Sequence, residues 1–122
     1  MIETFENYTQ EIPEYLTLTV IPFIVEYLKE NTLGETTAIK SNVLTEIICE
    51  KTKISISDVI LRRCIKYIQA NALVNWIVAT QKGFFYTEDI SVVQKQIKSL
   101  KSRESAIRNT REHIEKSLLQ YA

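Results

Sequence analysis

The stretch from Ser41 to Thr87 constrains the fold more than any other part of the sequence. It contains two segments with helical spacing of apolar residues, and the run at 52–55 breaks the pattern between them. Ser41 is expected to cap the first helix and Ser57, followed by Asp58, the second, because short polar side chains accept from first-turn amides. The predicted core stripes are Val43, Leu44, Ile47 and Ile48, followed by Leu61, Cys64, Ile65 and Ile68.

The side of the second helix opposite its core stripe carries three cations. At about 100° per residue, Arg62, Arg63 and Lys66 point away from the stripe, and Tyr67 lies beside them. Arginine pairs with guanine edges in a DNA major groove, while Lys and Tyr reach phosphates. The pattern predicts a DNA-recognition helix at about 58–69. A solvated helix face with the same residues is the alternative.

Two short runs of strand-forming residues follow this helix. Residues 73–79 and 84–87 are predicted to form a hairpin, with Gly83 free to take a positive φ in the turn. Gln81 and Lys82, at the tip, are expected to lie closest to a phosphate backbone. Helix, turn, helix and hairpin in this order predict a winged helix-turn-helix, in a chain that is mainly α with a small β-hairpin.

A set of short motifs extends over the same region. It comprises Leu61-Arg62, Ile65, Ile68, Asn71, Leu73, Ala79 and Gly83-Phe84-Phe85-Tyr86. With these motifs the chain resembles the winged helix-turn-helix proteins encoded by phages and prophages, which have Gly-Tyr-Tyr where this chain has Gly-Phe-Phe. The likeness extends to the arm at Thr9 to Ile12 and to the last helix, at Ser99-Leu100 and Arg103 to Ile107. The resemblance implies duplex DNA binding in gene regulation or replication.

The predicted DNA-binding site therefore combines three parts of the chain. They are the start of the first helix with the turn after it, the outer face of the recognition helix, and the wing at 80–83. Two copies are expected to read two half-sites on double-stranded DNA. The predicted DNA-binding residues are Lys40, Ser41, Ser55, Ser57, Arg62, Arg63, Lys66, Tyr67, Gln81 and Lys82.

The net charge of the chain is zero, although DNA-binding domains are often basic. The charge is unevenly distributed: residues 1–39 carry −6, residues 40–87 carry +4 and residues 88–122 carry +2. The predicted DNA-reading segment is thus basic. The neutral total also suits an alternative, a winged-helix protein–protein interaction module without DNA binding. If the positive charges of residues 40–87 lie on one surface, DNA binding is favoured over the protein-interaction module.

The remaining chain is predicted from its prolines and its one other glycine. A first helix covers Thr19 to Glu30, and Pro22 either lies in its first turn or kinks a longer helix that starts near Pro13. Gly34 is expected to cap this helix, and residues 36–40 to add a third strand to the hairpin. The predicted divisions are an acidic arm at 1–12, the winged-helix domain at 13–87 and a long C-terminal helix at 88–122.

The last helix, capped by Asp89 or Ser91, has a seam of alternating four- and three-residue steps. Seven of the nine seam positions are apolar or aromatic. About 30 helical residues extend about 45 Å, further than a small core covers, so a homodimer is predicted. The seam residues assigned to the dimer are Ile97, Leu100, Glu104, Ile107, Arg111, Ile114 and Leu118, between Val93 and Tyr121.

The two charged seam residues favour one orientation of that dimer. A parallel pair would place Glu104 against Glu104 and Arg111 against Arg111. An antiparallel pair centred near Ile107 and Arg108 brings each Glu104 close to the other chain's Arg111. The alternative is a seam that docks on the chain's own first helix, with the two charges at the solvent edge.

The sequence predicts neither catalysis nor a cofactor. Cys49 and Cys64 lack metal or redox spacing and are expected to be buried thiols. His113 is the only histidine, and two glycines form no phosphate loop, so neither a metal site nor a catalytic triad is expected, and no small-molecule partner is evident. No apolar run approaches the roughly 18 residues of a membrane span and no signal peptide is recognised, which predicts a cytoplasmic protein.

Overall fold

A computed structural model describes residues 12–71 and 73–121 of the chain. It is mainly helical, with a two-stranded antiparallel hairpin and a long C-terminal helix, which confirms the predicted class. The chain divides between Glu88 and Asp89 into two compact units. The arm predicted at 1–12, including the motif at Thr9 to Ile12, lies outside the described residues except for its last residue.

The first helical segment is the longer of the two alternatives. Helical backbone begins at Glu14 and continues through a π-helical turn, η1 (Leu16–Val20), into α2 (Ile21–Asn31). The wide π turn ends at Val20, two residues before Pro22, whose ring and missing N–H do not fit the ordinary helical hydrogen-bond pattern. Pro13 directly precedes this continuous segment, and Pro22 lies within it.

The end of α2 is buried against the hairpin. Thr32, not Gly34, ends the helix: its hydroxyl donates to the Leu28 carbonyl at 2.6 Å, and its own carbonyl accepts from the Tyr86 N–H at 3.0 Å. Gly34 has a positive φ of 97°, but it lies beyond the cap. It precedes a short 3₁₀ turn, η2 (Glu35–Thr37).

The predicted third strand is reduced to one residue. Ile39 pairs with Phe84 through two backbone hydrogen bonds, in which the Ile39 N–H donates at 2.9 Å and its carbonyl accepts at 2.8 Å. The 3₁₀ turn takes up the start of the 36–40 segment, so only its end can extend along the hairpin.

Two helices follow, α3 (Ser41–Thr52) and α4 (Asp58–Ala70). Ser57 caps α4 as predicted, since its hydroxyl oxygen accepts from the Ile60 N–H at 3.2 Å. The expected cap at Ser41 was wrong. Lys40, with extended backbone, is the capping position of α3, and Ser41 is already the first helical residue. The Ser41 side chain instead hydrogen-bonds to Asp58 on α4.

Lys53 ends α3 with a backbone φ of 64°, in the left-handed region. Because a side chain with a Cβ is disfavoured there, Lys53→Gly is expected to raise the free energy of unfolding by up to about 1 kcal/mol. Urea denaturation would measure the gain. Lys51→Gly, within the last turn of the same helix, is the control and should lose about 1 kcal/mol. Equal losses in both variants would contradict the assignment of Lys53.

The hairpin consists of β1 (Ile77–Thr80) and β2 (Gly83–Tyr86), with Thr80 paired to Gly83 across a two-residue tip. The second strand matches the prediction closely. The first begins at Ile77 rather than at residue 73, because the chain first turns back on α4, where the Leu73 N–H donates to the Ile68 carbonyl at 3.2 Å. Gly83 has the predicted positive φ, at 123°.

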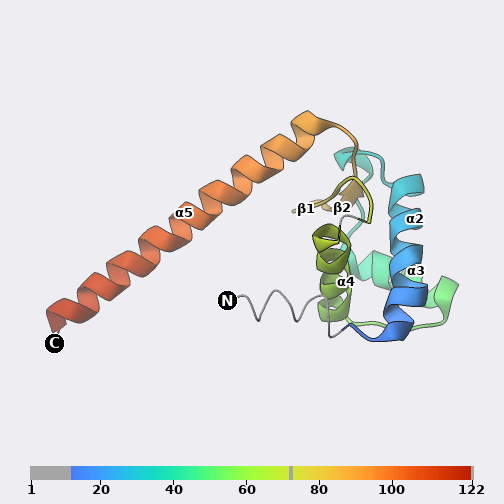
Figure 1. Ribbon diagram of the computed structural model, residues 1–122, viewed down its shortest axis with the longest axis horizontal. Coiled ribbons are helices and arrows are strands. Elements are labelled where there is room, and N and C mark those ends of the chain that lie inside the picture. The colour runs from blue at the N-terminus through green and yellow to red at the C-terminus, as the bar shows by residue number, and fades with distance from the viewer. Residues whose placement is uncertain (1–11, 72, 122) are drawn as a thin grey trace. The chain divides into compact units, whose positions relative to one another are not determined.

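In the first unit, α2, α3 and α4 pack against one another, while α2 contacts β2 and α4 contacts β1 (Figure 1). Cys64 is fully buried, and burial raises the pKa of its thiol to about 11. Cys49 is exposed, contrary to expectation, because only Leu44 and Ile48 of α3 are buried. The largest fully buried side chains are Leu16, Ile21, Ile24, Leu28, Leu44, Ile48, Leu61, Ile68 and Phe85.

The second unit is a single helix, α5 (Ile90–Tyr121). Asp89 caps it as predicted: its carboxylate accepts from the Ser91 N–H at 2.9 Å and from the Ser91 hydroxyl at 2.7 Å. These bonds hold the pKa of Asp89 below its ordinary value. No residue of α5 is buried. Across residues 12–71 and 73–121, no helix has the length and apolar character required to cross a membrane.

Candidate nucleic-acid interface

The start of α3 is held against the tip of the hairpin. The Ile39–Phe84 pairing places the residue before α3 beside β2, and the Lys40 ammonium then donates to the Gln81 carbonyl at 2.5 Å. Lys40 and Gln81 are 41 residues apart in the chain. One predicted site residue from the helix start and one from the tip therefore lie together.

A second link joins α3 to α4. The Arg62 guanidinium pairs with Asp58 one turn earlier, with 2.9 Å between Nε and Oδ2. A hydrogen bond from Ser41 and, after it, the bond from Arg62 hold the pKa of Asp58 below its ordinary value. The carboxylate of Asp58 thereby connects Ser41 with Arg62.

Arg62 also reaches the hairpin. Its guanidinium carbon lies 5.9 Å from the centroid of the Phe84 ring, within the range of a cation–π contact. The arginine side chain nevertheless remains 57% exposed, so its remaining N–H groups can contact another molecule. Arg62 is thus the residue at which α4, the start of α3 and β2 come together.

The rest of the outer face of α4 is a mixture of charged and apolar groups. Lys66 is exposed and lies one turn beyond Arg62, while Arg63 is half-buried one turn beyond Val59. Val59 is 67% exposed. Tyr67 is half-buried and packs against the hydrophobic core, so it belongs to the outer face only in part.

The other predicted site residues are spread between these elements. Ser55 is exposed in the loop between α3 and α4, and Lys82 is exposed at the hairpin tip beside Gln81. Ser57 is exposed, but its hydroxyl oxygen is engaged as the cap of α4. The structure therefore brings Lys40, Ser41, Arg62 and Gln81 together through contacts.

Comparison with known proteins found no family model, curated protein or solved structure that matches this chain. The function of the site is therefore inferred from its residues alone. Five of the seven cations between residues 40 and 87 lie on α4, at the start of α3 or at the hairpin tip. The other two, Lys51 and Lys53, lie at the opposite end of α3. Within the described part of the chain, no three His, Cys, Asp or Glu side chains are grouped to hold a metal ion.

Sequence reasoning missed the two residues that organise this surface. The sequence predicts Asp58 only as a helix-start charge, although its four-residue spacing from Arg62 is the spacing of helical ion pairs. The sequence predicts Phe84 as a strand residue, and its contact with Arg62 depends on tertiary packing that no local pattern encodes.

Proposed function

We propose that this protein binds duplex DNA as a winged helix-turn-helix, with α4 in the major groove and the hairpin tip on the phosphate backbone. The order α2, α3, α4, β1, β2, with Ile39 paired to the hairpin, supports this assignment. The observation that carries the proposal is the junction at Arg62, where α4, the start of α3 and β2 converge through contacts of three different kinds.

The residues of the junction suit distinct roles on DNA. Arg62, Arg63 and Lys66 supply side chains for guanine edges and phosphates from one helix. The first-turn amides of α3, next to Lys40, suit a phosphate, because helix starts carry free N–H groups and a positive dipole end. Lys82 adds a cation at the tip. Asp58 restricts Arg62 to one side of α4 before any contact with DNA.

Fluorescence anisotropy of the full chain with a labelled random duplex, titrated over salt, tests the proposal. Binding is expected at low salt and is expected to weaken as salt rises, because the cations of the first unit displace condensed counterions. The logarithmic slope is expected to be shallow, near the number of phosphates that these few cations can neutralise.

A folded chain that fails to bind duplex DNA at low salt would contradict DNA binding. The same surface would then be assigned to a protein partner, for which the exposed Val59 among cations is equally suited. Far-UV circular dichroism under the same conditions establishes that the chain is folded. Binding that does not change with salt would contradict the assignment of the cations.

A further inference from the structure

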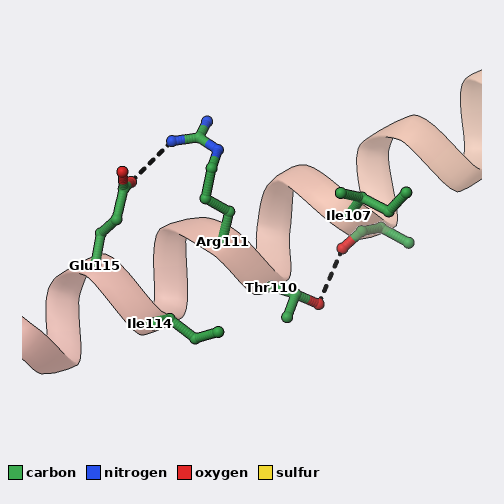
Figure 2. A pocket seen from close by; sticks show the side chains of 6 residues that line it. Ile107, Thr110, Arg111, Ile114 and Glu115 are labelled. Atoms are coloured by element: carbon green, nitrogen blue, oxygen red, sulfur yellow. Dashed lines mark hydrogen bonds and ion pairs between the residues drawn. The ribbon is translucent and has the colours of Figure 1, made fainter.

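One side of α5 carries two shallow hollows, one heptad apart. The first contains Ile107, Thr110, Arg111 and Ile114, and Figure 2 shows these side chains along a single helix with Arg111 paired to Glu115 at 2.8 Å. The second contains Ile114, Ser117, Leu118 and Tyr121. Ala106 and Glu115 also line the first hollow, and Gln120 the second. Each hollow thus includes four residues spaced i, i+3, i+4 and i+7. This is the four-residue hole that receives one side chain of a facing helix in a coiled coil.

Three apolar side chains in these hollows are exposed. Ile107, Ile114 and Leu118 are 70%, 64% and 66% exposed. A single helix cannot bury a row of apolar side chains by itself. Apolar residues at this regular heptad spacing are typical of a helix that pairs with another helix.

We propose that the occupant is α5 of a second copy of this chain, in antiparallel orientation. When the two helices overlap end to end, Leu100 of the second copy enters the first hollow and Val93 enters the second. These two side chains are seven residues apart, as are the hollows. The same alignment places Ile90 against Tyr121 and Ile97 against Ile114. Every layer of the seam then contains at least one apolar or aromatic side chain.

The charges along the seam select this orientation. In the antiparallel pair, Glu104 lies about one turn from Arg111 of the second copy. This attraction occurs twice, and a repulsion between Lys101 and Arg108 of the second copy also occurs twice. A parallel pair would instead set Glu104 against Glu104, Arg111 against Arg111, and Arg103 against Arg108 twice.

The antiparallel arrangement also determines where the two first units attach. They join the paired helices at opposite ends, about 50 Å apart along the axis, given a rise of about 1.5 Å per residue. A parallel pair would attach both units at one end. Dimerisation through α5 does not depend on DNA binding and is measured without DNA.

Sedimentation equilibrium of the full chain at micromolar concentration tests the dimer. The wild type is expected to be dimeric, and Glu104→Arg is expected to raise the dissociation constant at least about tenfold, because each interface pair becomes two arginines. Adding Arg111→Glu to Glu104→Arg is expected to restore it to within about threefold of the wild type.

Glu112→Arg is the matched control. It makes the same charge change and also removes four-residue ion-pair spacings within the helix, but it lies on the side of α5 away from the seam, so the dissociation constant should not change. Helix content of each variant is checked by circular dichroism. A monomeric wild type, an unchanged dimer in Glu104→Arg, or a double variant as weak as the single one would each overturn the proposal.

Discussion

Replacing Gly83 with alanine is expected to lower the free energy of unfolding by about 3 to 5 kcal/mol. An added Cβ would lie 2.2 Å from the Ile39 carbonyl oxygen and 2.4 Å from its carbonyl carbon, with no flexible side chain to move aside. The φ of 123° is itself unfavourable for alanine. To relieve the contact, β2 must separate from Ile39, and the two hydrogen bonds between Ile39 and Phe84 are then lost.

Gly34→Ala provides the matched control. Its φ is also positive, at 97°, but nothing lies within 4 Å of the added Cβ. This variant therefore carries only the backbone strain, about 1 to 3 kcal/mol. Urea denaturation of both variants separates the close approach from the conformational preference. Equal losses in the two variants would show that the contact between Gly83 and Ile39 contributes nothing of its own.

The local elements were predictable because each follows from short-range patterns. Helical spacing located α3, α4 and α5, and the cap at Ser57 follows from its hydroxyl and the helix start next to it. The positive φ of Gly83 was also predictable from its place after a turn. The approach of Ile39 to that glycine was not, because it depends on how a segment more than 40 residues away returns to the hairpin.

Errors arose where tertiary contacts compete with local preference. Ser41 has the side chain of a helix cap, but it is already the first residue of α3, and its side chain lowers the pKa of Asp58 on α4. Cys49 lies on the expected apolar side of α3, yet the neighbouring elements cover only Leu44 and Ile48. Neither outcome can be read from the periodicity of one helix.

The residues of the candidate site could be predicted from the sequence, but the contacts between them could not. The residues on the outer face of α4 can be assigned from a rotation of about 100° per residue. Lys40 can be assigned to the site because it precedes a predicted helix, and Gln81 and Lys82 because they lie in the predicted turn. The link between Lys40 and the Gln81 carbonyl requires the hairpin to fold back on α3. The contact of Arg62 with Phe84 has the same origin.

The triple change Arg62→Ala, Arg63→Ala and Lys66→Ala is expected to weaken binding to duplex DNA at least about 100-fold at low salt. Each lost contact to a base edge or phosphate costs about 1 to 3 kcal/mol of binding free energy, and the three are removed from one face. The salt slope should also fall, by about 2 to 3, because fewer counterions are released. Fluorescence anisotropy over a salt series measures both quantities.

The fold should survive this triple change, because Arg62 is more than half exposed in its pair with Asp58 and such surface contacts contribute at most about 1 kcal/mol.

A control triple, Lys95→Ala, Lys98→Ala and Lys116→Ala, removes the same charge from positions of α5 outside the seam. It should change the affinity less than about threefold, since it leaves the α4 face intact. If both triples weakened binding equally, total charge would account for the affinity and the assignment of the α4 face would be wrong. A loss confined to the first triple would require a specific surface, because only the position of the removed charges differs between the two proteins.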